Sequence, residues 1–184
     1  MRVTGGHSRG RRLKAGKGKR IRPTFARVRE AIYDIIPPDL SGCNILDLFA
    51  GVGSLGIEAL SRGGEKAVFI DQSREAVRII EENLKHCSLL DKGKVIKFPV
   101  SQGLRKLEET KERFDLVLAD PPYEKGLVDK ILAKLAKSSI LENGAVIVMA
   151  HSVREIPKGA YPPLLLTHRR VYGTTVVSFY ERKD

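Results

Sequence analysis

The chain has 184 residues, of which 42% are hydrophobic and 30% charged, and its formal net charge is +11. This length suits one ordinary domain with a real core. No apolar run approaches the ~20 residues that cross a bilayer, and the polar N-terminus does not resemble a secretory signal. We expect a cytoplasmic protein without membrane contact and, because no long exposed apolar pattern stands out, a monomer.

The positive charge is concentrated in the first 30 residues. They hold eleven of the 33 Lys and Arg residues and a single acid, Glu30, and so carry +10 of the total +11. Interspersed glycines favour a flexible or hairpin-like arm over a helix. A cationic arm indicates a polyanionic partner because phosphate contacts release counterions, and a solubilising tail is the alternative. We assign residues 1–22 to this arm and residues 23–184 to the domain that follows.

The remaining pattern is that of an α/β protein. A helix is expected from Pro23-Thr24 until Pro37-Pro38 ends it. Helical spacing is clearest at 77–87 and 128–135, between short apolar runs at 43–49, 67–70, 95–98, 114–119 and 145–150. Such runs predict strands buried on both faces of a parallel sheet. The last two strands, 164–171 and 174–180, are joined so tightly that they must pair antiparallel.

Cysteine and histidine usage predicts no metal site. Cys43 and Cys87 lack a C-x-x-C spacing, so we expect free core thiols and no disulfide. The four histidines also lack ligand spacing and are expected in the arm, at element ends or on the surface.

The first strand runs into a glycine-rich turn, Gly51-Val52-Gly53-Ser54-Leu55-Gly56. This G-x-G-x-x-G pattern is weak alone in a chain with 17 glycines, but its position between a strand and a helix favours a nucleotide-binding turn. Candidate cofactor contacts in this stretch are Phe49, Ala50, Gly51, Gly53 and Gly56.

Two acids favour an adenosine cofactor. Asp71, followed by Gln72, ends the second strand 20 residues after Gly51, where a carboxylate can bind both hydroxyls of a ribose. Ser73 is the better cap for the next helix. Asp47 would repel a pyrophosphate but suits the ammonium and sulfonium of S-adenosylmethionine; a structural role, bonded to backbone, stays open.

The fourth strand ends in Asp120-Pro121-Pro122-Tyr123. Two prolines hold a rigid, extended turn. Asp120 and the Pro121 carbonyl can accept hydrogen bonds from an exocyclic amine, and Tyr123 offers a face on which a flipped base stacks. We predict that these four residues, Pro122 included, form the catalytic motif.

This motif resembles the [DN]-P-P-[YFW] signature of amino-group methyltransferases, and D-L-F-A-G-V-G-S-L-G resembles their S-adenosylmethionine motif. The stretches V-T-G-G-H-S-R-G-R-R-L, R-P-T, R-V-R-E-A and G-S-L-G-I-E-A-L-S-R-G, with the Gly126-Leu127 after the motif, resemble the bacterial 16S ribosomal RNA guanine-N2 methyltransferases that modify guanine 966. The resemblance covers essentially the whole chain. It implies a Rossmann-like class I methyltransferase with a seven-stranded, mostly parallel sheet, an antiparallel last strand and a short basic arm.

The resemblance also implies a cofactor and a partner. S-adenosyl-L-methionine would be converted to S-adenosyl-L-homocysteine, and the substrate would be 16S ribosomal RNA or the assembling 30S subunit. The family often has an acid after the third strand for the adenine amino group; here Ser101 or Gln102 is expected to accept that bond. The expected RNA contacts are Arg9, Arg11, Arg12, Lys14, Lys17, Lys19, Arg20, Arg22, Arg27 and Arg29.

Three other functions remain open. An adenine-N6 methyltransferase acting on DNA or RNA can use the same motif, although DNA enzymes usually carry a separate target-recognition domain. A protein glutamine methyltransferase typically has Asn where this chain has Asp120. A ribosome assembly factor that only binds RNA is disfavoured by the acids at positions 47, 71 and 120.

Overall fold

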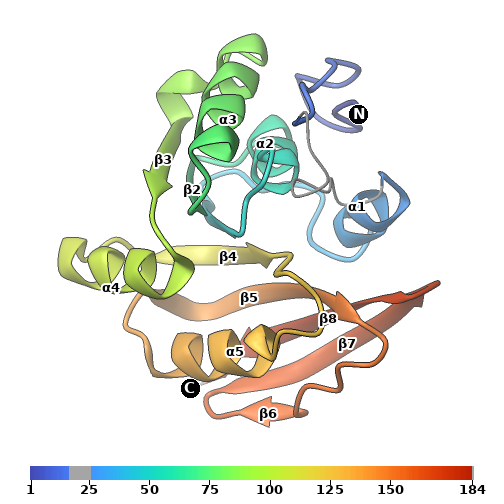
Figure 1. The fold of residues 1–184 in the computed structure, drawn as a ribbon, viewed down its shortest axis with the longest axis vertical. Coiled ribbons are helices and arrows are strands. Elements are labelled where there is room, and N and C mark those ends of the chain that lie inside the picture. The colour runs from blue at the N-terminus through green and yellow to red at the C-terminus, as the bar shows by residue number, and fades with distance from the viewer. Residues whose placement is uncertain (17–25, 184) are drawn as a thin grey trace.

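The computed structural model describes residues 1–16 and 26–183, which form an α/β fold around one mixed sheet (Figure 1). The sheet has the strand order β3-β2-β1-β4-β5-β8-β7-β6. The strands are β1 (Asn44–Leu48), β2 (Lys66–Asp71), β3 (Gly93–Lys97), β4 (Phe114–Ala119), β5 (Leu141–Ser152), β6 (Ala160–Tyr161), β7 (Leu164–Tyr172) and β8 (Thr175–Arg182).

Strands β1 to β5 pair in parallel, while β8 pairs antiparallel with both β5 and β7. The Rossmann-like fold with an antiparallel tail is therefore confirmed. The expected number of seven strands is wrong for the described residues, which form eight. The additional strand, β6, is only two residues long and lies between Gly159 and Pro162, so it leaves no alternation in the sequence to detect.

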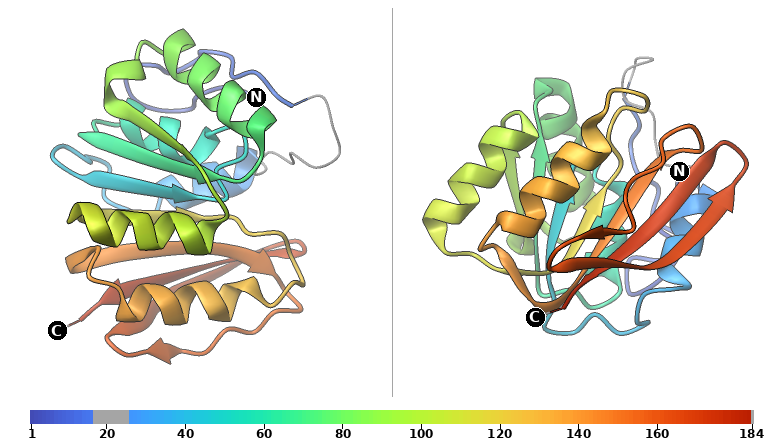
Figure 2. Two further views of the ribbon diagram at one scale, coloured as in Figure 1. Left: turned by 60° about the vertical axis from the view of Figure 1, so that its left-hand side comes forward. Right: turned by 90° about the horizontal axis from the view of Figure 1, so that it is seen from below.

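Helices cover both faces of the sheet, as the two views in Figure 2 show. One core lies under α1 (Ala26–Tyr33), α2 (Ser54–Ser61) and α3 (Arg74–His86), and the other under α4 (Val100–Thr110) and α5 (Leu127–Lys137). A short 3-10 turn, Leu90–Lys92, precedes β3. Regular helix α1 ends at Tyr33, before the predicted stop at Pro37, and a turn follows in which Ile35 and Ile36 both donate to the Ile32 carbonyl at 3.2 Å.

Residues 1–16 and 26–183 show the lengths of the helices, the grouping of possible metal ligands and the state of the cysteines. Their helices lack the length and apolar character of a membrane-spanning segment. Within these same ranges no cluster of three or more His, Cys, Asp or Glu side chains is placed to hold a metal ion. Both cysteines are free thiols, and Cys87 is buried at the end of α3, whereas Cys43 is only half-buried.

The N-terminal residues fold back on themselves and pack against the domain. Arg2 and Arg12 form an antiparallel bridge, and Val3 and Leu13 are 2% and 3% exposed within the same core as α1 and α2. Backbone N–H groups of this segment also reach the end of α2, where His7 donates to the Ser61 carbonyl. Residues 1–14 are thus an integral part of the domain; the predicted boundary at residue 22 lies outside the described residues.

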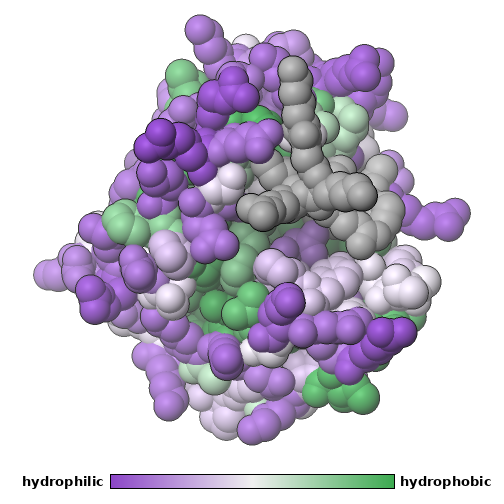
Figure 3. All heavy atoms as spheres, in the orientation of Figure 1, coloured by the Kyte–Doolittle hydropathy of each residue, from purple (hydrophilic) through white to green (hydrophobic). Residues whose placement is uncertain are grey.

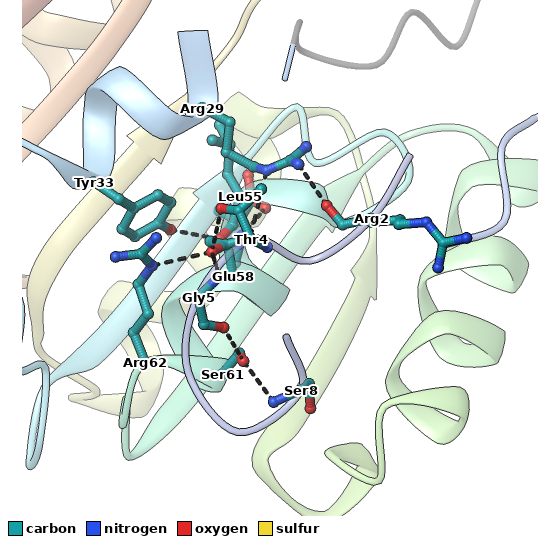
Figure 4. Close-up of polar contacts among 12 residues, drawn as sticks. Arg2, Thr4, Gly5, Ser8, Arg29, Tyr33, Leu55, Glu58, Ser61 and Arg62 are labelled. Atoms are coloured by element: carbon teal, nitrogen blue, oxygen red, sulfur yellow. Dashed lines mark hydrogen bonds and ion pairs between the residues drawn. The ribbon is translucent and has the colours of Figure 1, made fainter. Parts of the chain in front are cut away.

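Glu58, on α2, is the main polar anchor of this N-terminal segment (Figure 4). Its fully buried carboxylate accepts hydrogen bonds from the backbone N–H groups of Thr4 at 2.8 Å and Gly5 at 2.7 Å, and from the Thr4 hydroxyl at 2.8 Å. Two guanidiniums balance its charge: Arg62 at 3.0 Å and Arg29 at 3.5 Å. A buried carboxylate needs such partners because desolvation otherwise disfavours its charge.

Arg29 was expected to contact RNA, and that prediction is wrong. Its side chain is 1% exposed and points into the protein, where it pairs with Glu58 and donates to the Arg2 carbonyl at 2.6 Å. The helix places it on the face turned toward α2 (Figure 4), one residue after buried Val28. Arg29 therefore serves folding, and cannot contact a solvent-borne ligand without leaving the core.

A second anchor is Asn83 on α3. Its amide oxygen accepts from Lys14 N–H at 2.8 Å, and its amide nitrogen donates to the carbonyls of Lys14 and Val52 at 3.2 and 2.9 Å. Val52 belongs to the glycine-rich turn, so one buried side chain joins the basic segment to that turn.

We predict that Glu58→Ala lowers the free energy of unfolding by about 3–5 kcal/mol, because the buried Arg29 guanidinium loses its counter-charge. Chemical denaturation measures this change. Glu82→Ala is a matched control: Glu82 also pairs with a residue of the N-terminal segment, Lys14, but their side chains are 35% and 64% exposed. That exposed pair is worth at most about 1 kcal/mol. Equal losses in the two variants would contradict the anchoring role of Glu58.

Candidate active site

The carboxyl ends of β1, β2 and β4 meet at one edge of the sheet. Leu48, the last residue of β1, lies opposite Ile70 of β2 and Ala119 of β4. The residues that follow these positions are therefore neighbours: the glycine-rich turn, Asp71 and Asp120. Ligands of open α/β sheets bind at this edge.

The turn after β1 has an unusual backbone. Phe49, Gly51 and Gly53 have φ angles of 57°, 58° and 77°, in the left-handed region that favours glycine. Ala50 N–H donates to the Ile70 carbonyl at 3.1 Å, and Gly53 N–H donates to the Ala50 carbonyl at 2.7 Å. The turn is thus held against β2 and leads directly into α2, which begins at Ser54.

Asp71 fastens the turn from the end of β2. One carboxylate oxygen accepts from Gly51 N–H at 2.9 Å and the other from Ser73 N–H at 2.8 Å. The Ser73 hydroxyl caps α3 by accepting from Ala76 N–H at 3.3 Å, as expected. Gln72 is exposed beside it. Asp71 is half-buried, so it both shapes the turn and faces the edge where a ribose contact is predicted.

Asp47, on β1, holds the first turn of α2 through a hydrogen bond. It is 1% exposed, and its carboxylate accepts from Gly56 N–H at 2.9 Å. Gly56 is itself buried, and a Cβ there would lie 2.4 Å from the Phe69 ring. The third glycine of the pattern thus permits close packing of α2 on β2, and this role needs no ligand.

Three carboxylates gather at this edge. Burial raises the pKa of Asp47 well above its ordinary value, and the charges of Asp120 and Asp71 raise it further, against the opposing effect of the Gly56 hydrogen bond. Among the described residues no basic side chain forms an ion pair with Asp47. A cation bound at this edge would relieve that repulsion.

The Asp120-Pro121-Pro122-Tyr123 loop is tied to the antiparallel part of the sheet. The hydroxyls of Tyr123 and Thr175 lie 3.4 Å apart, and Glu124 accepts a hydrogen bond from the Ser152 hydroxyl at 3.2 Å. Pro121 is buried and Pro122 exposed. Gly126, with φ 61°, then starts α5. The loop is therefore positioned by β5 and β8 at the same edge as the glycine-rich turn.

Ser101 and Gln102 lie in the first turn of α4, both exposed. Pro99 caps this helix, and its carbonyl accepts from Gln102 N–H at 2.9 Å. Their place after β3, the neighbour of β2, is compatible with the predicted adenine contact. That contact stays a prediction.

The basic residues of the N-terminal segment differ in their surroundings. Arg9, Arg12 and Arg27 are exposed. Arg11 donates to the His86 carbonyl and the Ser88 hydroxyl, and Lys14 pairs with Glu82, so α3 orients both. The other expected RNA contacts, Lys17, Lys19, Arg20 and Arg22, lie outside the described residues.

Two structural residues were missed at the level of sequence, Glu58 and Asn83. Each is a polar residue on the buried face of a helix: Glu58 stands between Ile57 and Ala59, and Asn83 lies one turn after Ile79 and Ile80. An apolar helix face interrupted by a polar residue was the available signal. His151 is also buried: its Nδ1 lies 2.9 Å from the Ser152 carbonyl and its Nε2 2.9 Å from the Ser178 hydroxyl. Burial lowers the pKa of His151, so it is a neutral structural residue.

We predict that Asp47→Asn stabilises the ligand-free protein at neutral pH. Because the carboxyl has a higher pKa folded than unfolded, the folded state binds more protons above about pH 4, and stability falls as pH rises toward the raised pKa. The Asn variant keeps an acceptor for Gly56 N–H, but its stability should not fall as the pH rises, because an amide does not titrate in this range. Unfolding free energies of both proteins between pH 4 and 8 test this prediction; parallel profiles would refute the raised pKa of Asp47.

The chain is similar in sequence to known proteins over nearly its whole length. Over residues 1–181 the chain matches the family described as Conserved hypothetical protein 95. It is 35% identical to the Bacillus subtilis protein YlbH, with full coverage of both chains. It is 30% identical to Ribosomal RNA small subunit methyltransferase D of Escherichia coli K12, covering 100% of this chain and 90% of that protein.

Solved structures of other proteins have a similar fold. The Escherichia coli protein yhhF has a TM-score of 0.86 at 29% identity, with 100% of this chain and 98% of the other covered. An RNA methyltransferase from Salinibacter ruber, solved in complex with S-adenosyl-L-homocysteine, shares the fold with a TM-score of 0.67 at 17% identity, covering 89% and 95% of the two chains. The chain belongs to the Conserved hypothetical protein 95 family, together with the small-subunit ribosomal RNA methyltransferases D.

Proposed function

We propose that the protein is an S-adenosylmethionine-dependent RNA methyltransferase that modifies the exocyclic N2 amine of a guanine in small-subunit ribosomal RNA, guanine 966 by the family resemblance. The observation that carries this proposal is the meeting of two loops at one sheet edge. The turn held by Asp47 and Asp71 lies beside the Asp120-Pro121-Pro122-Tyr123 loop. The related ribosomal RNA methyltransferases support the reaction class.

The charges at this edge fit the proposed cofactor. S-adenosylmethionine supplies an electrophilic methyl group on a sulfonium and also carries an ammonium. Asp47 and Asp71 place carboxyl groups at the edge, and Asp71 ends β2 where a ribose hydroxyl pair is commonly bound. The residues that would hold the cofactor are Phe49, Ala50, Gly51, Gly53, Asp71, Gln72, Ser101 and Gln102, with buried Asp47 and Gly56 shaping the helix behind them.

Asp120 and the Pro121 carbonyl would act on the amine. Guanine N2 is a weak nucleophile because its lone pair is delocalised into the ring. Two acceptors facing its N–H groups orient the lone pair toward the methyl group and stabilise the positive charge that develops on nitrogen. The C–N bond forms as the C–S bond breaks, and the amine then loses one proton, for which Asp120 is the nearest proposed acceptor.

Tyr123 would hold the target base. A base must leave its stack to reach this edge, and an aromatic side chain replaces part of the lost stacking. The Tyr123 hydroxyl lies beside that of Thr175 on β8, a contact that fixes the ring relative to the sheet. Pro122 stiffens the loop between the acid and the ring.

Adenine-N6 methylation of DNA or RNA is the second candidate, because adenine presents a similar amine to the same acceptors. The decisive assay offers labelled cofactor to unmodified small subunits and to free ribosomal RNA, and identifies the modified nucleoside. We expect N2-methylguanine, and N6-methyladenine would overturn the guanine assignment. A protein that binds RNA but transfers no methyl group would be an assembly factor.

We predict that Asp120→Ala abolishes methyl transfer while cofactor affinity stays nearly unchanged, because the carboxylate acts on the target amine. Turnover with small subunits and cofactor binding by calorimetry separate the two effects. Asp115→Ala is a matched control at the start of the same strand: its carboxylate accepts from Asn44 N–H at the far edge of the sheet, so turnover should persist. An active Asp120→Ala enzyme would refute the assignment.

A further inference from the structure

A second cationic segment flanks the candidate active site. Residues 153–174 carry Arg154, Lys158, Arg169 and Arg170 against one acid, Glu155, a net charge of +3. Residues 31–152 sum to −2 and residues 175–184 to zero. Positive charge outside the N-terminal region is thus concentrated in the β5–β6 connection and the β7–β8 hairpin.

The structure brings these two segments together beside the catalytic loop. Val153 N–H donates to the Thr174 carbonyl at 3.0 Å, and Arg169 donates to the Pro157 carbonyl at 3.3 Å. Glu124, which directly follows Tyr123, pairs with Arg154 at 3.6 Å. Because β8 runs antiparallel to β5, the hairpin tip lies at the same edge as the carboxyl ends of the parallel strands.

The outer side chains of these segments are unusually exposed for their type. Ile156 is 80%, Val171 62% and Val153 41% exposed, and the Arg154 side chain 79%. Figure 3, in the orientation of Figure 1, shows a hydrophobic group standing out over the connection between β5 and β6. Arg170 is exposed next to Val171, and its Nη1 donates a hydrogen bond to the Arg169 carbonyl at 3.1 Å. Successive residues of β7 face opposite sides of the sheet, so Arg169 and Val171 lie on one face of the hairpin and Arg170 lies on the other.

We propose that this hairpin surface, formed on both faces of the hairpin tip by Val153, Arg154, Ile156, Arg169, Arg170 and Val171, binds the substrate RNA strand that flanks the target base. The inference rests on the proposed function. Arginines suit phosphates and stacked bases, and exposed apolar side chains suit unstacked bases and riboses. The charge favours RNA over a protein partner, since interfaces with proteins have no requirement for a net positive surface.

The two cationic surfaces divide the task of holding RNA. The N-terminal segment is anchored to α2 and α3, whereas the hairpin surface is attached to the catalytic loop through Tyr123–Thr175 and Glu124–Arg154. A strand that contacts both would cross the edge where Asp120 lies. A phosphate bound to Arg154 would compete with Glu124 for its guanidinium. Because Glu124 directly follows Tyr123, this competition would change the contacts that hold the catalytic loop.

The test is equilibrium binding of unmodified small subunits and of free ribosomal RNA by the full chain with S-adenosyl-L-homocysteine. Arg154→Ala combined with Arg170→Ala should weaken RNA binding on the order of tenfold. The slope of log Kd against the logarithm of the salt concentration should fall by about two, one for each lost phosphate contact. Cofactor affinity should not change. The matched control is Lys66→Ala with Lys137→Ala, which removes the same charge from exposed positions, at the start of β2 and the end of α5.

Crosslinking identifies the class of partner. A photoreactive benzoylphenylalanine in place of Val171 should crosslink to ribosomal RNA within the small subunit. Crosslinks to ribosomal protein alone, or RNA binding by the Arg154→Ala, Arg170→Ala protein equal to that of the control, would overturn the proposal. The proposed function fails separately, if the wild-type protein binds RNA through this surface but yields no N2-methylguanine.

Discussion

Two carboxylates hold the turn between β1 and α2, and the candidate site depends on that turn. Asp71 fastens its first glycine and Asp47 the third, each by a 2.9 Å bond to a backbone N–H. The left-handed residues between them bring the chain from a buried strand into a buried helix within five residues. Since β4 lies next to β1, the same turn defines the space that Asp120 and Tyr123 face.

The same acids have opposite effects on stability and on ligand binding. A buried carboxylate near two others costs folding free energy, which the raised pKa of Asp47 records. That cost falls when a cation binds at this edge, so a destabilised site is pre-organised for a positively charged ligand. The protein offsets it elsewhere through two large hydrophobic cores on either side of the sheet.

Glu58 and Asn83 link the basic N-terminal segment to the elements that carry the turn. Glu58 lies on the helix that the turn starts, and Asn83 touches both Lys14 and Val52. Arg9 and Arg12 are therefore presented from a fixed platform. A rigid cationic platform loses less conformational entropy on binding RNA than a flexible arm does. Together with the hairpin surface it surrounds an acidic site with positive charge.

The chain determined much of this by itself, because local patterns have local causes. Buried apolar runs such as 114–119 predict strands, the G-x-G-x-x-G pattern predicts the turn, and Asp120-Pro121-Pro122-Tyr123 predicts a rigid loop at a strand end. Parallel pairing then places their carboxyl ends at one edge. The tight hairpin and the Ser73 cap follow from the same kind of reasoning.

Tertiary structure alone decided which charges face solvent. Arg29 and Arg27 look alike in sequence, yet one is buried on Glu58 and the other exposed, since the partner lies 29 residues away on another helix. Gly56 likewise serves packing on Phe69 of β2. The charged side chains of residues 153–174 form one surface only because the fold brings β5, β7 and β8 together beside Tyr123. These outcomes depend on contacts between distant segments, which no local pattern encodes.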